Sequence, residues 1–216
     1  MLRLRLATAG KPVVLCIGAH CDDIEIGCGG TLLQLRASYP DVTIHWAILS
    51  APPAREPEAR ASARCFLGDG AQHSVSTEQF RDGFFPFDGA AIKSYFEALA
   101  QRVKPDLIIT HDRNDLHQDH RLVGELTLQT FRDHAILEME VPKYDGGLTP
   151  PNVYVPLEGQ EADRKIEYLL RCYASQQSKP WFKEATFRGL MSVRGVECRA
   201  PSGSAEAFHG RKLVVG

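Results

Sequence analysis

Apolar positions along the chain change period several times, which predicts strands alternating with helices. Residues 12–18 and 42–49 are apolar, β-branched runs of strand length, and residues 106–110 form a shorter one. Helical spacing follows in the segments 31–39, 57–67, 90–103 and 119–132. We therefore predict an α/β fold, a Rossmann-like three-layer sandwich in which a mostly parallel sheet has helices on both faces.

The pattern loosens beyond Val141, so we expect an irregular C-terminal portion. Residues 142–151 are rich in Gly and Pro and predict a loop, residues 153–157 a strand, and residues 162–173 a helix. The chain has no internal repeat, and we expect one domain over residues 1–216 in which residues 142–216 vary and shape the substrate site. The aromatic segment 80–88 fits a loop over a pocket, or equally a surface turn with a few core aromatics.

Composition and net charge exclude several classes of protein. The 216 residues are 44% hydrophobic and carry a net charge of −2, which excludes a disordered chain and gives no attraction to nucleic acid or anionic lipid. No stretch reaches the roughly 18–20 apolar residues of a membrane span. The basic start, with Arg3 and Arg5, precedes an apolar stretch too short for a secretory signal. Six cysteines without a Cys-x-x-Cys pair indicate reduced thiols, so we expect a cytoplasmic protein.

The first candidate site, His20-Cys21-Asp22-Asp23, comes directly after the first predicted strand. Ligands bind beyond the carboxyl ends of strands in open parallel sheets. His20 and Asp23 are three residues apart on a turn and can share a zinc ion, which leaves Asp22 free beside it. The alternative is that Asp22 or Asp23 caps the following helix.

The glycines at 27, 29 and 30 invite a second interpretation. They resemble a phosphate-binding loop but lack the full Gly-x-Gly-x-x-Gly spacing, so a dinucleotide site is weakly supported. We expect instead that they let a helix pack close to the sheet.

The second candidate site, His117-Gln118-Asp119-His120, follows the strand at 106–110. Its two histidines can present one imidazole to a metal and one to a substrate, and Asp119 can orient a neighbouring imidazole. A solvated helix start capped by Asp119 is the alternative. Both clusters lie past the carboxyl ends of predicted parallel strands, and together they offer three ligands and an open position, as a catalytic zinc site does.

At these residues the sequence resembles the LmbE-like, or PIG-L, family of zinc-dependent N-deacetylases. The family pattern Ala-His-Pro-Asp-Asp, continued as Ile-Glu-x-Gly-x-Gly-Gly, is matched by residues 19–30, with Cys21 in place of Pro. The His-x-Asp-His pattern is matched by residues 117–120, and the similarity spans about residues 12–135.

The resemblance implies roles for individual residues. His20, Asp23 and His120 would bind Zn2+, although histidine and carboxylate ligands accept Fe2+ as well. Asp22 would be the general base toward zinc-activated water, and a protonated His117 would stabilise the developing oxyanion, with Asp119 beside it. Arg55 and Asp82 resemble family residues that contact the sugar; both could equally be surface charges.

Three hypotheses follow for the function. The first is removal of an acetyl group from the nitrogen of an amino sugar, such as an N-acetylglucosamine conjugate. The second is a zinc amidase or esterase that cleaves a larger, non-sugar acyl group. The third is a non-catalytic nucleotide- or sugar-binding module. All three imply a small-molecule partner, and none fixes the oligomeric state, a homo-oligomer included.

Overall fold

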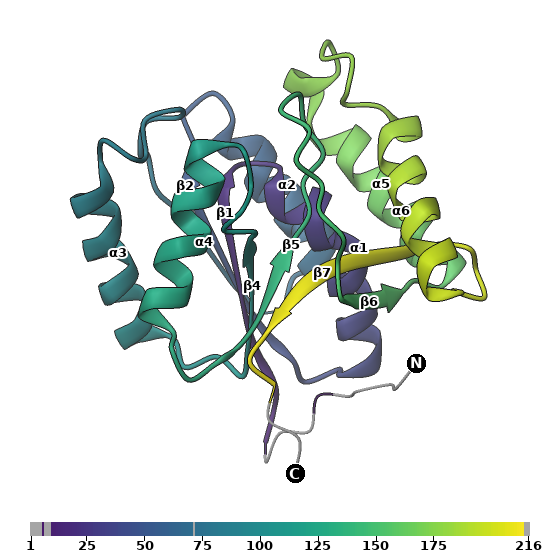
Figure 1. Ribbon diagram of the computed structural model, residues 1–216, viewed down its shortest axis with the longest axis horizontal. Coiled ribbons are helices and arrows are strands. Elements are labelled where there is room, and N and C mark those ends of the chain that lie inside the picture. The colour runs from purple at the N-terminus through teal and green to yellow at the C-terminus, as the bar shows by residue number, and fades with distance from the viewer. Residues whose placement is uncertain (1–5, 7–9, 71, 214–216) are drawn as a thin grey trace.

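One seven-stranded sheet runs through the molecule in the order β3-β2-β1-β4-β5-β7-β6 (Figure 1). The computed structural model describes residue 6 and residues 10–70 and 72–213; Arg3 and Arg5 lie outside the described residues. Neighbours are parallel from β3 to β5, whereas β7 runs antiparallel to β5 and β6. The strands are β1 Val13–His20, β2 Thr43–Ser50, β3 Ser74–Thr77, β4 Leu107–His111, β5 Ala135–Met139, β6 Val153–Pro156 and β7 Ala205–Arg211.

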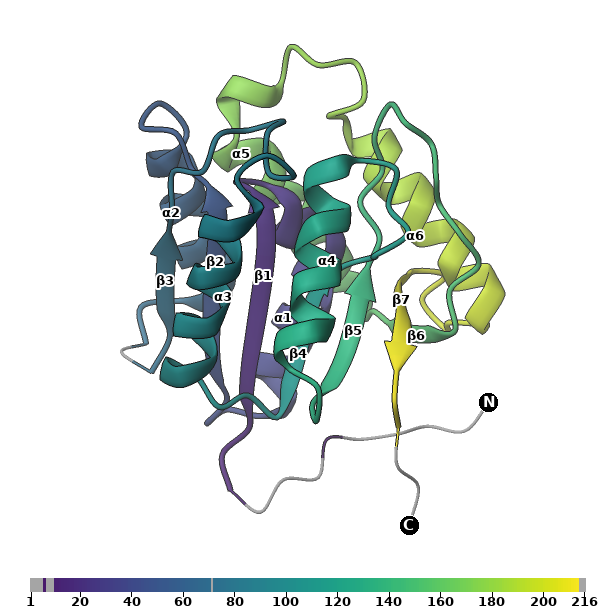
Figure 2. The same ribbon diagram turned by 60° about the vertical axis from the view of Figure 1, so that its left-hand side comes forward.

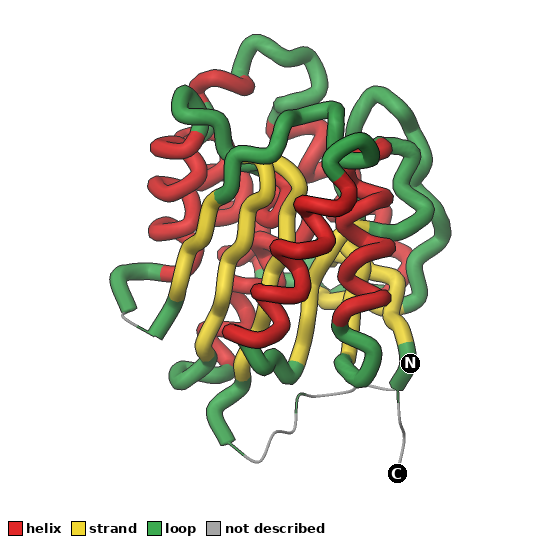
Figure 3. The backbone as a smooth tube through the Cα atoms, turned by 90° about the vertical axis from the view of Figure 1, so that its left-hand side faces the viewer, coloured by secondary structure: helices red, strands yellow, loops and turns green. Residues whose placement is uncertain are grey.

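Helices cover both faces of the sheet, which confirms the predicted three-layer α/β fold (Figures 2 and 3). The pair α3 and α4 lies on one face, and α1, α2, α5 and α6 lie on the other. The helices are α1 Asp23–Ser38, α2 Glu56–Leu67, α3 Gly89–Arg102, α4 Gln118–Thr130, α5 Gly159–Cys172 and α6 Glu184–Cys198, with a 3-10 turn η1 at Ala174–Gln176. Within the described ranges, no helix has both the length and the apolarity needed to cross a bilayer.

Alternation along the central strands divides the core into two halves. In β1, Val14 and Cys16 belong to the half under α1 and α2, whereas Leu15 and Ile17 belong to the half under α3 and α4. All four side chains are fully buried. A strand that is buried on both faces needs apolar residues at successive positions, and the sequence of β1 has such a continuous apolar run.

The strand order reverses between β1 and β4. The chain moves outward from β1 through β2 to β3, and later outward from β4 to β5 on the other side. His20 is the last residue of β1 and His111 the last of β4, so both lie at the switch point where such folds bind ligands.

The glycine run lies inside α1, which begins at Asp23, earlier than the sequence pattern indicated. A Cβ atom on Gly27 would lie 2.6 Å from Sδ of Met139 in β5, and one on Gly30 would lie 2.5 Å from Leu157. The expectation that these glycines let a helix pack close to the sheet is therefore confirmed.

The C-terminal part is more regular than the sequence predicted, because buried charges hide its pattern. We did not predict the short edge strand β3. In the later part of the chain we did not predict β5, α6 and β7. Each carries a buried charged residue whose partner is distant in the sequence: Glu138 Oε2 in β5 accepts from Arg211 Nε at 2.7 Å, Glu206 in β7 pairs with Lys165 Nζ at 2.6 Å, and Arg194 in α6 donates to Glu140 Oε2 at 2.9 Å. Because charged residues are mostly exposed, a short stretch of sequence predicts that these positions lie at the surface, although charged residues can be buried when they are paired.

Gly124 provides a test of how closely α4 packs against the end of β4. A Cβ atom there would lie 2.6 Å from the backbone oxygen of His111 and 2.9 Å from the backbone nitrogen of Arg113. Because backbone atoms cannot rotate away, we expect Gly124→Ala to lower the free energy of unfolding by about 1–3 kcal/mol in urea denaturation.

The matched control is Gly189→Ala in α6. Gly189 is exposed and a Cβ atom there meets nothing within 4 Å. This substitution should be neutral or stabilise by up to about 1 kcal/mol, because alanine favours a helix more than glycine does. Equal effects at the two positions would contradict the packing argument.

Candidate active site

Three potential metal ligands converge on one point at the carboxyl edge of the sheet. His20 Nδ1 lies 3.1 Å from His120 Nε2 and 3.3 Å from Asp23 Oδ2, and the third side of the triangle, from His120 Nε2 to Asp23 Oδ2, is 3.4 Å. His20 ends β1, Asp23 begins α1 and His120 lies in the first turn of α4. The structure thus brings together two motifs about a hundred residues apart.

Carboxylates outside the triangle fix which imidazole nitrogens carry protons. His20 Nε2 faces Asp119 Oδ2 at 3.2 Å and Asp82 Oδ1 at 3.1 Å, and His120 Nδ1 faces Asp115 Oδ2 at 3.0 Å. A carboxylate only accepts, so each outer nitrogen is the donor. The two inner nitrogens and Asp23 Oδ2 form a set of ligand atoms that suits a cation, either a metal ion or the proton that the raised pKa of His20 places on Nδ1.

The electrostatics at this point favour a positive charge. Burial disfavours a charged His20, but Asp23, Asp119 and Asp82 outweigh it and raise its pKa well above the usual value. Burial also opposes ionisation of Asp23, yet the surrounding histidines hold its pKa well below the usual range. Burial lowers the pKa of His120 to about 3, so this imidazole is neutral and able to bind a metal.

Other groupings of possible ligands surround the same point. In the described part of the chain, three overlapping sets have ligand atoms within 4.8 Å of one another: His20, His117 and His120; Asp23, His111 and His120; and His20, Asp82 and Asp119. Every set contains His20 or His120, so they mark one centre rather than several.

Asp22 lies beside the triangle, and among the described residues only one of its two carboxylate oxygens has a partner. Its Oδ1 pairs with Arg55 Nη2 at 3.0 Å, whereas Oδ2 is buried without a hydrogen-bond partner. Burial raises its pKa although Arg55 opposes the shift. Asp22 occupies the N-cap position of α1 but makes no side-chain cap bond, and Asp23 accepts instead from the backbone N–H of His20 at 2.7 Å. The capping alternative is therefore wrong for both residues.

Asp119 connects His20 to the segment 80–88. Besides facing His20, its two oxygens accept from the backbone N–H groups of Gly83, at 2.6 Å, and Phe85, at 3.2 Å. Phe85 is fully buried while Phe87 is exposed. The segment is thus a loop that Asp119 holds against His20. Within this loop, the side chain of Asp82 is 66% exposed and contacts His20.

His117 is the cap of α4, where a capping Asp119 was the alternative. Its Nδ1 accepts from the backbone N–H of Asp119 at 3.2 Å. The ring lies edge-on to His20 at a centroid distance of 5.1 Å. Burial and the proximity of His20 lower its pKa. His117 is therefore neutral near pH 7 and, because Nδ1 accepts, donates from Nε2; the protonated form expected from the sequence is not favoured.

Two contributors, Asp115 and Lys143, were missed in the sequence. Asp115 shapes its own loop, because its Oδ1 accepts from the backbone N–H of His117 at 2.8 Å. Its Oδ2, however, holds His120 and also Lys143 Nζ, at 2.7 Å. Burial opposes ionisation of Asp115, but His120 and Lys143 keep its pKa well below the usual range. The Gly- and Pro-rich loop that carries Lys143 has no motif from which this contact could be read.

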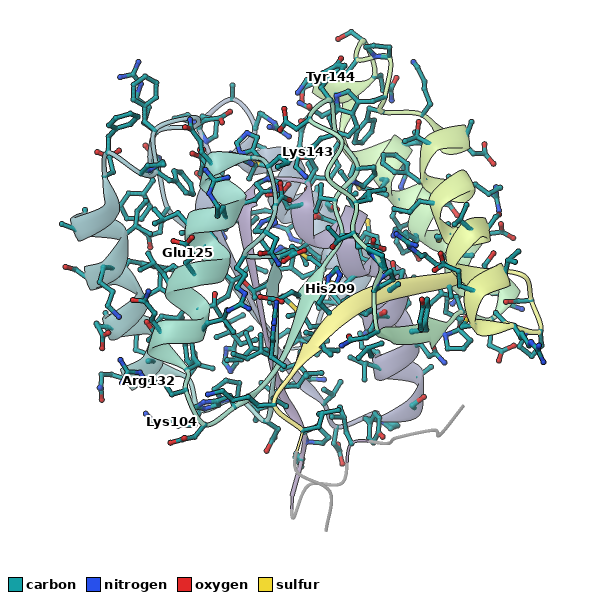
Figure 4. The ribbon with its side chains drawn as sticks, viewed as in Figure 1. Lys104, Glu125, Arg132, Lys143, Tyr144 and His209 are labelled. Atoms are coloured by element: carbon teal, nitrogen blue, oxygen red, sulfur yellow. The ribbon has the colours of Figure 1, made fainter. Side chains whose placement is uncertain are left out.

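Figure 4 places Lys143 and the exposed Tyr144 at the upper edge of the molecule, opposite Lys104 and Arg132. A shallow hollow lies under this loop, and Asp112, Asp115, Lys143 and His209 are among its lining residues. The ion pair of Lys143 with Asp115 thus connects the loop 142–151 to the carboxylate that contacts His120.

His111 and Cys21 lie next to the site and support its backbone. His111 Nε2 accepts from the backbone N–H of Ala19 at 2.9 Å and lies 3.2 Å from Asp23 Oδ2, so it joins β4 to β1. The Cys21 thiol is fully buried and its Sγ contacts the backbone oxygen of Ser50 at 3.5 Å. Burial raises the pKa of Cys21 to about 12, so the residue that replaces proline is a neutral core thiol.

Comparison with known proteins places the chain in a family. The family model described as PIG-L, GlcNAc-PI de-N-acetylase, matches residues 15–131. No curated protein matches the sequence.

Solved structures share the fold at low sequence identity. The N,N'-diacetylchitobiose deacetylase from Pyrococcus horikoshii superposes with a TM-score of 0.74 at 21% identity, over 92% of this chain and 83% of its own. A conserved protein from Thermus thermophilus gives 0.76 at 19% identity, over 94% and 96% of the two chains. GalB, the 4-carboxy-2-hydroxymuconate hydratase from Pseudomonas putida, gives 0.75 at 17% identity, over 95% and 98%.

The family model spans more than half of the chain and contains both candidate motifs, residues 20–23 and 117–120. This protein belongs to the PIG-L (GlcNAc-PI de-N-acetylase) family.

Proposed function

We propose that this protein is a zinc-dependent N-deacetylase that removes an acetyl group from the nitrogen of an amino sugar or its conjugate. The observation that carries the proposal is the triangle of His20 Nδ1, Asp23 Oδ2 and His120 Nε2, with distances of 3.1–3.4 Å, beside a buried carboxylate that has a free oxygen. Family membership and deacetylase neighbours, among them enzymes of teicoplanin biosynthesis, support this reaction class.

The donor set fits zinc, and Fe2+ is accepted by the same ligand types. His20, Asp23 and His120 would hold the ion, which when bound polarises the amide carbonyl and lowers the pKa of water. All three are buried, and the carboxylates behind the two histidines fix their tautomers, so the ligands need no rearrangement.

Asp22 acts as the general base. The unpartnered Oδ2 is available to accept a proton, while the ion pair of Oδ1 with Arg55 keeps the carboxylate in place. Burial raises its pKa, which makes it a stronger base than a solvated aspartate and still leaves Arg55 to favour the ionised form.

His117 supplies a hydrogen-bond donor for the developing oxyanion. With Nδ1 occupied by the N–H of Asp119, the neutral ring donates through Nε2. Protonation of the leaving amine then falls to Asp22, which has received the proton from water.

Sugar hydroxyls are recognised at the rim. Asp82 is mostly exposed and has one oxygen engaged with His20 at 3.1 Å, which leaves the other for a substrate hydroxyl. The Arg55 side chain is 18% exposed and paired with Asp22, and the exposed part of its guanidinium would donate to a substrate hydroxyl.

The proposal is tested by metal content together with acetate release. Purified protein should contain about one metal ion per chain, lose release of acetate from an N-acetylglucosamine conjugate after chelation, and regain it with Zn2+. His120→Ala should abolish metal binding, whereas His134→Ala, which removes a histidine outside the site, should not. A wild-type metal content in His120→Ala would show that the ligand assignment is wrong.

Asp22→Asn separates catalysis from metal binding. The amide keeps the shape of the side chain but cannot accept a proton, so we expect kcat to fall by about 10²–10⁴-fold at unchanged metal content. Asp41→Asn, which changes an exposed aspartate paired only with Lys11 at 3.6 Å, is the control and should leave kcat unchanged. An Asp22→Asn enzyme of normal rate would remove this residue from the mechanism.

Asp115→Ala tests the carboxylate behind His120. Without the acceptor 3.0 Å from Nδ1, the imidazole loses its fixed tautomer and orientation. We expect the Kd for Zn2+, measured by competition with a chelating dye, to rise about 10–100-fold. Asp133→Ala, at an exposed position, should leave Kd unchanged, and equal affinities in the two variants would refute the role of Asp115.

Hydration of a carbon–carbon double bond is the second candidate, favoured by the fold shared with GalB at a TM-score of 0.75. The two reactions give different products. An unsaturated hydroxy acid would lose its ultraviolet absorbance without releasing acetate, whereas an N-acetylated amino sugar would release acetate and a free amine.

A further inference from the structure

A second reactive feature lies away from the metal-binding residues, at the contact between α2 and α5. Cys65 of α2 and Cys172, the last residue of α5, place their Sγ atoms 3.7 Å apart. Both are partly exposed, whereas the other four cysteines are buried: Cys16, Cys21, Cys28 and Cys198. Solvent reaches this thiol pair and not the rest.

The two helices are fixed against each other where the thiols meet. Phe66 packs edge-on against Tyr168 at a centroid distance of 5.3 Å. Beyond the end of α5, Ser175 N donates to Glu58 Oε1 at 2.9 Å. Contacts at both ends of the interface hold the thiols at this separation.

A positive charge lies next to one of the two sulfurs. Arg171 Nη2 is 3.3 Å from Cys65 Sγ, and a guanidinium stabilises a thiolate electrostatically. Burial and the neighbouring Cys65 raise the pKa of Cys172 to about 11, so Cys172 rests as the thiol. On the contact with Arg171 we assign Cys65 as the attacking cysteine and Cys172 as the one that completes the disulfide.

We propose that Cys65 and Cys172 form a reversible disulfide that cross-links α2 to α5 when the protein meets a small oxidising disulfide such as oxidised glutathione. A disulfide needs an S–S distance of about 2.05 Å, which rotation of the two side chains approaches from the present contact. The proposal does not depend on the deacetylase activity.

The exchange takes place in two balanced steps. The Cys65 thiolate attacks one sulfur of oxidised glutathione, breaks its S–S bond and releases one glutathione thiolate, which leaves a mixed disulfide on Cys65. Cys172 loses its proton to solvent, attacks the Cys65 sulfur and expels the second glutathione. The protein loses two protons and two electrons, and both are recovered in the two glutathione thiols.

The bridge would act on the wall behind the active site. Tyr173 follows Cys172 directly, and its hydroxyl donates to the backbone oxygen of Cys21 and contacts Glu25 Oε1 at 2.6 Å. Cross-linking α5 to α2 therefore secures the segment that supports the turn carrying Asp22.

The experiment compares wild-type protein equilibrated in reduced and in oxidised glutathione. Thiol titration under denaturing conditions should fall from six reactive thiols to four, and peptide mapping should identify one Cys65–Cys172 bridge. Because the bridge closes a loop of about a hundred residues, the melting temperature should rise by several degrees and return on reduction.

Matched variants separate this pair from other thiols. In Cys65→Ser the oxidant should leave no internal bridge and no rise in melting temperature, and Cys172→Ser should retain glutathione on Cys65 as a mixed disulfide. Cys16 and Cys28 also contact each other but are fully buried, so they form the internal control. Six unreacted thiols in the wild type, a bridge between chains, or a bridge at Cys16–Cys28 would each overturn the proposal.

Discussion

The site at the end of β1 depends on three potential ligand atoms that are held close together although they repel one another when no cation lies among them. Three potential ligand atoms, His20 Nδ1, Asp23 Oδ2 and His120 Nε2, lie within 3.4 Å of one another, which is unfavourable unless a metal ion or the proton of a charged His20 lies among them. Carboxylates on the far sides of the imidazoles keep the protons outward. Such a site attracts a positive charge. Much of the surrounding structure keeps the three atoms from moving apart.

The fold supplies that restraint through the strand order. The reversal between β1 and β4 places the turns after both strands side by side, so that α1 and α4 begin at the same place. His111 joins the two strands by accepting from the backbone of Ala19, and Gly124 lets α4 approach the backbone of β4. The chemistry of the site is therefore inseparable from close backbone contacts that leave no room for a methyl group.

Sequence patterns were sufficient for the fold class and for the neighbourhood of the site, because both depend on local signals. Apolar runs predicted β1, β2 and β4, and short motifs located His20, Asp23 and His120, whose role as ligands stays a prediction. Three of the elements that were missed, β5, α6 and β7, contain charges neutralised by partners up to 73 residues away. The other, β3, is a four-residue edge strand with a single apolar residue, Val75, too short a signal to predict a strand. Asp115 and Lys143 were missed for the same reason, since their importance arises from contacts across the chain and not from spacing along it.

The ion pair between Lys143 and Asp115 has a consequence for any change to the loop that carries Lys143. Lys143 belongs to the loop 142–151, yet its charge reaches a carboxylate that contacts His120. Replacing the loop would therefore change more than the surface it presents to a substrate, because Lys143 also influences how strongly Asp115 attracts the proton on His120 Nδ1. The shape of the loop and the basicity of the His120 imidazole are thus coupled in this protein.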